Sequence, residues 1–414
     1  MIKKTTLTPN NKITLILLVV IIILMSALYP MSTFCAKDTT VLTQISESLN
    51  QSVVEELDEI DFSELNLLID EFEKTNVNFF SISNIKTKVY AIISGESSIN
   101  YSSFFSSVFS SVIQKIIAYL PLLSIIVAVG IISNLLGGIK SKFNEKSTNN
   151  LIHLICFMAV VIVITGMIST LTNTATKSIN GMVNIVDSIF PILLTIMIGT
   201  GATASASVFQ PVVAIISTYV ADLFKYFVLP LFIFSFVFGI ISNLSDGIKL
   251  DKFSSFINSL FKWTVGLVFT LFFAVFAIQG ISAGKFDSIS IRTTKYTIKS
   301  YIPIMGGYLS DGMDLIVASS ILIKNSIGLV GILIVISYIL SPLLDIVIFS
   351  LIMKLLSAIL QPMGNNKISN FLSSTSKAIT MLSTVIIAIG FMYFLSIGLI
   401  MSTSNLVVWW KVIF

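Results

Sequence analysis

Five charged residues lie in or beside long apolar runs in the carboxy-terminal half of the chain, where they could carry protons or ions. Charged groups at membrane depth are costly and usually face a cavity or an opposite charge. We favour a functional role for two aspartates set among glycines, and an interfacial position at helix ends for the two lysines. The candidate functional residues are Asp311, Asp314, Lys324, Asp345 and Lys354.

A second candidate is the basic segment Gly284–Ser300, which contains Arg292, Lys295 and Lys299 and only one acidic residue, Asp287. Cytoplasmic loops of membrane proteins are enriched in lysine and arginine. If the membrane repeats of this chain are parallel, however, this segment lies outside the cytoplasm. We therefore predict that it lies flat on a membrane surface or binds an anionic partner.

Other kinds of chemistry have little support in the sequence. The phosphate-binding pattern GxxxxGK[ST] is absent. The two cysteines, Cys35 and Cys156, and the one histidine, His153, do not suggest a disulfide, a metal cluster or a nucleophilic site. We expect no catalytic residues, no metal and no cofactor, so that any energy comes from an ion gradient or from another subunit.

The composition is that of a polytopic membrane protein, for which membrane lipid is the first expected partner. Of 414 residues, 55% are hydrophobic and only 11% are charged, and the mean hydropathy is +0.96. Soluble proteins carry about 25% charged residues. The stretch 37–115 contains twelve acidic residues and five lysines, which argues against nucleic acid as a partner.

The amino-terminal third divides into a leader and an exported segment. Residues 1–36 combine lysines, an apolar run and small residues, as in a signal peptide or an uncleaved signal anchor. Residues 37–115 follow as an extracytoplasmic segment. Its apolar residues, such as Val53, Leu57 and Phe72, recur near helical spacing, which predicts a few amphipathic helices. These could be a docking surface for partner proteins or a solvated cap.

Apolar runs of spanning length begin at Ile116, and the first two are Ile116–Leu136 and Leu151–Leu171. Three lysines between them place their loop in the cytoplasm. Two further stretches, Phe190–Val208 with GTGATASAS and the more polar Ile302–Ile323, predict re-entrant or broken helices. Ordinary pairs of crossings are the alternative.

A repeated motif organises these runs. Gly130–Lys140 reads GIISNLLGGIK and Gly239–Lys249 reads GIISNLSDGIK, nine identities in eleven positions. We predict membrane repeats at 116–225 and 226–337 and a partial third at 338–414, in parallel orientation. The expected fold is an all-α polytopic helical bundle. The motif residues are Pro121, Gly130, Asn134, Pro230, Gly239 and Asn243.

Part of the chain resembles a known family. Residues Gly280–Gly331, with IRTTKYTIKSYIPIMGGYLSDGMDLIVASSILIKNSIGLVG at their centre, and the QPMG of Gln361–Gly364 resemble the stage III sporulation protein AE family. The resemblance implies a subunit of the complex that joins mother cell and forespore, in the mother-cell membrane surrounding the forespore. The implied partners are other stage III A sporulation proteins, including a cytoplasmic ATPase, and indirectly the forespore protein Q.

Two functions remain open at this point. The first is an integral membrane subunit of a sporulation transenvelope channel or secretion-like complex, energised by a partner. The alternative is an autonomous secondary transporter that uses intramembrane carboxylates such as Asp311 and Asp314. A structural scaffold is a third possibility. An intramembrane enzyme lacks a nucleophile and metal ligands.

Overall fold

The computed structural model describes residues 41–75, 79–80, 84–95, 101–138, 145–244, 250–301 and 306–403. Within these ranges the chain is helical and has no β-strand, so the predicted all-α class is confirmed. Contacts divide the chain into a short unit, Met1–Ser48, and a large unit, Leu49–Phe414. The predicted leader, residues 1–36, lies outside the described residues.

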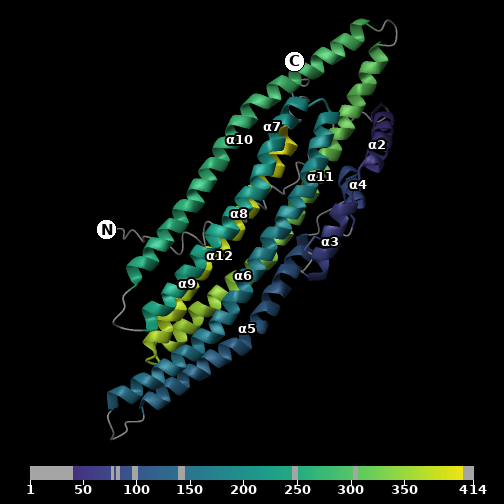
Figure 1. Cartoon of the computed structure of the whole chain (residues 1–414). Coiled ribbons are helices and arrows are strands. Elements are labelled where there is room, and N and C mark those ends of the chain that lie inside the picture. The colour runs from purple at the N-terminus through teal and green to yellow at the C-terminus, as the bar shows by residue number, and fades with distance from the viewer. Residues whose placement is uncertain are drawn as a thin grey trace, which may run out of the picture. The chain divides into compact units, whose positions relative to one another are not determined.

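Three short helices precede a series of much longer ones (Figure 1). Two segments of π-helix, η1 and η2, interrupt the third long helical stretch, which begins with α7 and continues through α8 to α9. The bounds are α2 Val41–Glu59, α3 Ser63–Thr75, α4 Ile85–Ile93, α5 Tyr101–Gly138, α6 Glu145–Gly199, α7 Thr203–Ala214, η1 Ile215–Val220, α8 Ala221–Leu223, η2 Phe224–Val228, α9 Leu229–Leu244, α10 Asp251–Tyr301, α11 Gly306–Leu360 and α12 Asn366–Thr403.

Six helical stretches of the described chain are long and apolar enough to cross a membrane. The longest of them, Leu151–Gly199 and Gly312–Leu360, each contain 49 residues. At 1.5 Å per residue such a helix is about 74 Å long, more than twice the roughly 30 Å of a bilayer's hydrocarbon core. Length alone therefore does not fix which part of each helix is in lipid.

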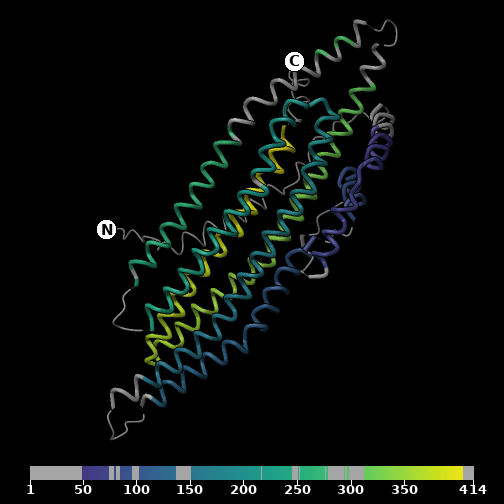
Figure 2. The backbone as a smooth tube through the Cα atoms, in the orientation of Figure 1, coloured from purple at the N-terminus to yellow at the C-terminus, as the bar shows by residue number. Residues whose placement is uncertain are grey.

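The long helices pair as hairpins whose tips lie at one end of the bundle (Figures 1 and 2). Helices α5, α9 and α11 run toward this end, and α6, α10 and α12 run away from it. Phe371, near the start of α12, contacts the rings of Phe157 on α6 and Phe236 on α9. Asn365, before α12, donates from Nδ2 to the carbonyl of Gly130 on α5 at 2.7 Å.

The α11–α12 hairpin forms the centre of the bundle, and pairs of serines hold its two helices together. Ser350 and Ser376 each donate to the other's backbone carbonyl, at 3.2 and 3.0 Å. Ser357 and Ser369 do the same at 2.9 and 2.8 Å. The two pairs are seven residues apart on each helix, so both lie on the contact face. Small side chains allow the helix backbones to approach closely.

Helix α11 continues through Pro342, where the sequence suggested a boundary between segments. A proline inside a helix leaves the carbonyl four residues earlier without its usual donor. Here that carbonyl belongs to Tyr338, and Ser178 on α6 donates to it from Oγ at 2.6 Å. A neighbouring helix thus satisfies the freed group and the helix remains continuous.

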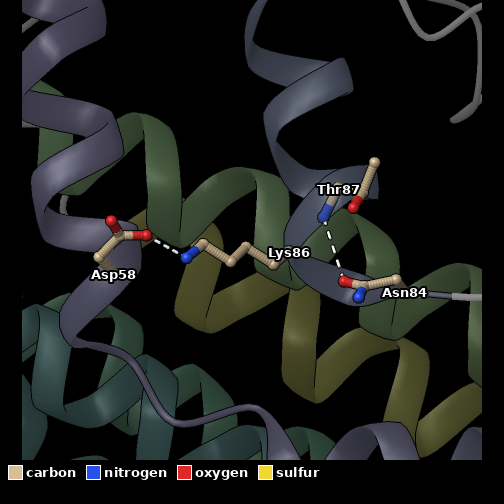
Figure 3. Close-up of polar contacts among 4 residues, drawn as sticks. All are labelled: Asp58, Asn84, Lys86 and Thr87. Carbon is tan, nitrogen blue, oxygen red and sulfur yellow. Dashed lines mark hydrogen bonds and ion pairs between the residues drawn. The ribbon is translucent and has the colours of Figure 1, made fainter.

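Helices α2 to α4 use their apolar faces within the molecule. Val53, Leu57 and Val89 are buried, and the ring of Phe72 on α3 lies 4.0 Å from that of Tyr338 on α11. Lys86 on α4 pairs with Asp58 on α2 (Figure 3). The buried apolar residues of this segment are thus covered by the chain itself, and a docking surface for partner proteins stays a prediction.

The start of α4 is capped by a side chain. Asn84 accepts a hydrogen bond at Oδ1 from the backbone N–H of Thr87 at 3.3 Å (Figure 3). Such a contact satisfies one of the donors that have no partner at a helix start.

The predicted broken helices have different outcomes. Within Phe190–Val208 the chain reverses between α6 and α7, and Gly201 adopts a φ of +82° at the turn. A left-handed backbone of this kind favours glycine. In contrast, α11 has no break after Ile323. Residues 302–305 lie outside the described residues, and a re-entrant position in the membrane stays a prediction.

The repeat copies have related but not identical surroundings. Gly130 is buried and lies beside the α11–α12 turn, while a Cβ at Gly239 would lie 3.7 Å from Ser374 Cβ on α12. Asn243 donates back to the Gly239 carbonyl at 2.7 Å, whereas Asn134 is exposed and near Gly364. Pro121 is inside α5 and Pro230 is the second residue of α9.

The predicted repeat boundaries fall inside helical segments, in α5, η2 and α11. The repeats therefore share one packed bundle rather than forming separate compact units. Their common ancestry stays a prediction.

Candidate functional site

Lys324 is a fully buried lysine, with a relative exposure of 0%. Its ammonium nitrogen donates to the carbonyls of Ile400 at 3.2 Å and Met401 at 3.0 Å. These carbonyls belong to the last turn of α12, where backbone acceptors have no partner within the helix and the helix dipole favours positive charge. The sequence suggested that Lys324 extends to a membrane interface. In the structure it instead caps the carboxy-terminal end of α12 from α11.

Asp345 forms an ion pair with Lys115 of α5, with 2.7 Å between Oδ1 and Nζ. The two side chains are only 24% and 18% exposed. Beside them, Tyr119 is buried and contacts the ring of Phe349, 5.4 Å between centroids. An ion pair of opposite charges is one of the ways in which membrane helices hold charged groups. This pair joins α5 to α11.

The remaining candidates do not join these two features in one site. Lys354 is exposed and Asp314 is half-buried, both on α11. The side chain of Asp311 lies outside the described part, as do those of Arg292, Lys295 and Lys299. In the described chain no group of three or more histidine, cysteine, aspartate or glutamate side chains could hold a metal ion.

A groove with a partly polar lining lies between α6 and α7–η1. Its volume is about 450 Å³. The apolar part of its lining comes mainly from α6 and includes Phe190 and Leu194. The polar part comes from both walls: Asp187, Thr195, Ser207, Gln210 and Ser217.

The π-helical segment η1 borders this groove through Ser217, and both η1 and η2 are held by polar contacts. Tyr393 on α12 donates from its hydroxyl to the carbonyl of Ser217, in η1, at 3.0 Å. Lys225, in η2, pairs with Asp222 at 2.8 Å and donates to Asn180 Oδ1 on α6 at 3.1 Å. π-Helical turns are rare and frequently occur at functional sites.

Sequence reasoning missed both Lys115 and the polar groove. Lys115 stands one residue before the apolar run Ile116–Leu136, and its partner is distant in sequence, so no local pattern indicates the pairing. The groove has no comparable signal, because its polar lining combines residues of α6, such as Asp187 and Thr195, with Gln210 of α7 and Ser217 of η1.

His153 does not belong to either feature. Its Nδ1 lies 2.9 Å from Ser133 Oγ, a contact between α6 and α5 near the hairpin tips. Cys156 is buried and has no disulfide partner in the described chain.

Long apolar helices, hairpins held by serine pairs, and charged groups that cap a helix or pair with each other define a multi-pass helical membrane protein. The model of the family "Stage III sporulation protein AE" matches residues 83–404, which is most of the chain. The chain therefore belongs to the stage III sporulation protein AE family, and the expected resemblance is confirmed.

A curated relative agrees with this assignment. The chain is similar to Stage III sporulation protein AE of Bacillus subtilis (strain 168), with 25% identity over 326 residues, covering 79% of this chain and 82% of the relative. No solved structure matches the chain. Family membership implies a role in sporulation.

Proposed function

We propose that this protein is an integral membrane subunit of the channel or secretion-like complex that joins mother cell and forespore, in the mother-cell membrane surrounding the forespore. Its partners in this proposal are the other stage III A sporulation proteins, including a cytoplasmic ATPase, and indirectly the forespore protein Q. The protein contributes structure and a path through the membrane, and a partner supplies the energy. No catalysis by this chain is part of the proposal.

The observation that carries the proposal is the use of charge inside the bundle. A transporter driven by an ion gradient needs intramembrane carboxylates that bind and release the coupling ion. Asp345 is held by Lys115, and Lys324 caps α12. Both therefore stabilise packing between helices, as expected for a subunit that does not couple transport to an ion gradient.

The autonomous transporter remains the second candidate, because Asp314 is half-buried on α11. It lies shortly before the two serines of α11 that contact Glu56 of α2. Glu56 on α2 accepts from Ser319 at 2.5 Å and from Ser320 at 2.8 Å. A carboxylate from the exported segment thus lies within two turns of Asp314 along the chain.

Purification from sporulating cells and reconstitution decide between the two. We expect the full-length protein to copurify with stage III A proteins, and the isolated protein in liposomes to move no solute under an imposed ion gradient. Gradient-driven uptake by the isolated protein, abolished by Asp311→Asn with Asp314→Asn, would refute the proposal in favour of the transporter.

A further inference from the structure

The exposed face of α6 changes its chemistry along the helix. Between Leu151 and Ile162 it presents large apolar side chains. Between Ile162 and Ile198 no large apolar side chain is exposed. Instead this face carries exposed polar residues over a distance of about 30 Å. They form the polar stripe: Asn173, Lys177, Asn180, Asn184, Asp187 and Thr195.

The neighbouring helices expose large apolar side chains at the same height along the bundle, beside the ion pair of Lys225 with Asp222. The hydrogen bond from Lys225 to Asn180 brings η2 level with the stripe. Next to Lys225, Leu223 is 39% and Phe227 is 45% exposed. Whether the exposed side chains are polar or apolar therefore depends on the side of the bundle and not on the position along its axis.

Helix α10 has the same apolar character on its own exposed side. Phe269 on α10 contacts Phe391 on α12, with ring centroids 6.3 Å apart. Two residues away from Phe391 is Tyr393, which bonds to η1, so this part of α10 is also level with η1. There Leu271 is 59% exposed.

This difference limits where each side can lie. A charged side chain at the centre of a bilayer costs about 2.5–3.5 kcal/mol even on the most lenient scales, so the stripe with Lys177 and Asp187 is unfavourable in lipid. Conversely, exposed large apolar residues such as Leu223 and Leu271 favour contact with lipid. One side of this section faces an apolar environment and the other a polar one.

The end of the stripe nearest α7 also lines the groove described above. Asp187 and Thr195 line it from α6, and Gln210 lines it from α7. The opposite wall ends in η1, where Ser217 lines the groove and its backbone carbonyl accepts a hydrogen bond from the Tyr393 hydroxyl. The stripe thus has a matching polar edge on the next helix.

We propose that the polar stripe of α6 and the facing edge of α7 form one wall of a water-filled passage for hydrophilic solutes, while Leu223, Phe227 and Leu271 face lipid. The proposal rests on the proposed function in one respect, because another subunit of the assembly supplies the remaining wall. Lys177 and Asp187 carry opposite charges, so this wall favours neither anions nor cations.

The test compares cysteine accessibility at two sites of equal height. Asn184→Cys lies on the stripe and Leu223→Cys on the apolar side. Each is introduced into the full chain with Cys35→Ala and Cys156→Ala, and expressed in sporulating cells with the partner proteins. Membranes are then exposed on both faces to a charged, water-soluble methanethiosulfonate, and the labelling rate is measured.

We expect Asn184→Cys to react at least about tenfold faster than Leu223→Cys, because the reagent attacks a thiolate that requires contact with water. Equal rapid labelling would show that this section stands in water on all sides, and absence of labelling at both sites would show that the stripe is packed against a partner. Either result overturns the proposal.

Gln210→Cys, on the other wall of the groove, repeats the test if Asn184→Cys fails to accumulate. Labelling is read on the protein itself and spore formation by the same strains is counted separately. If spores form but Asn184→Cys is not labelled faster than Leu223→Cys, the polar passage is wrong and the proposed function is unaffected. If Asn184→Cys is labelled faster but no spores form, the passage is supported while the link to the proposed function is not.

Discussion

Reversing the charge of Lys324 should disrupt the α11–α12 hairpin far more than reversing the charge of an exposed lysine on the same helix. Lys324 is fully buried and donates to two carbonyls of the last turn of α12. Lys324→Glu replaces this donor by an acceptor next to the negative end of the helix dipole. Lys354→Glu, at an exposed position of α11, is the matched control.

The expected magnitudes follow from these contacts. Hydrogen bonds from a charged group contribute about 1.5–3 kcal/mol each, and burying an ammonium group costs several kcal/mol. Lys324→Met loses the hydrogen bonds but also removes the cost of burying the ammonium group, so the free energy of unfolding should fall by only about 0–3 kcal/mol. Lys324→Glu leaves an uncompensated buried charge, which costs about 3–5 kcal/mol or more out of a total stability of about 5–15 kcal/mol.

Thermal unfolding of the purified full-length protein in detergent, followed by the fraction that remains monodisperse, measures the order. We expect the midpoint for Lys324→Glu to fall by about 5 °C or more, with Lys324→Met intermediate and Lys354→Glu close to the parent. If Lys324→Glu and Lys354→Glu unfold at the same temperature, the buried cap does not stabilise α12 and the reasoning is wrong.

Three further predictions concern single contacts. Gly181→Ala should destabilise the protein by about 1–3 kcal/mol, because the added Cβ would lie 2.1 Å from the Tyr338 ring, whereas Gly166→Ala, with nothing within 4 Å, should be neutral or stabilising; equal melting temperatures would contradict this. Lys115→Met should lower stability by about 1–3 kcal/mol, given the partial exposure of the ion pair, and exchanging Lys115 and Asp345 should restore most of it; a swap no better than the single change would argue against the pair. The pKa of Asp61 lies below its ordinary value because it accepts hydrogen bonds from the side chain and backbone of Ser63, so this contribution is present above the ordinary pKa of about 4 and is lost as the pH falls through the lowered value; the protection of amides at the start of α3, measured relative to the intrinsic exchange rate at each pH, should decrease there, and unchanged protection would refute the assignment.

The fold class could be predicted because apolar runs of spanning length appear directly in the sequence. The limits of the helices could not. Helix α11 continues through Lys324 and Pro342, two residues that favour a boundary when only neighbouring residues are considered. In the structure Lys324 is satisfied by α12 and the carbonyl left free by Pro342 by Ser178 of α6. Both solutions depend on partners that are distant in sequence.

The candidate site shows the same limit. The sequence singled out Asp345 because charge is rare in such helices, but its role follows from Lys115, which lies 230 positions earlier. The sequence favoured an interfacial Lys354, and it is exposed. The polar stripe of α6 has a regular spacing in the sequence, but which side of the helix is covered by neighbours is a property of the packed bundle.

The central claim is that the bundle crosses the membrane with its hairpin tips on the cytoplasmic side. The α11–α12 tip and the α6–α7 turn lie at opposite ends of their helices (Figure 1). Met363→Cys at the tip and Thr203→Cys at the turn, each in a chain with Cys35→Ala and Cys156→Ala, can be produced in cells that have not begun sporulation, where the protein is in the cell membrane, and exposed to a membrane-impermeant maleimide in intact protoplasts. We expect Thr203→Cys to be labelled in intact protoplasts and Met363→Cys only after permeabilisation. Labelling of both from the same side would contradict it.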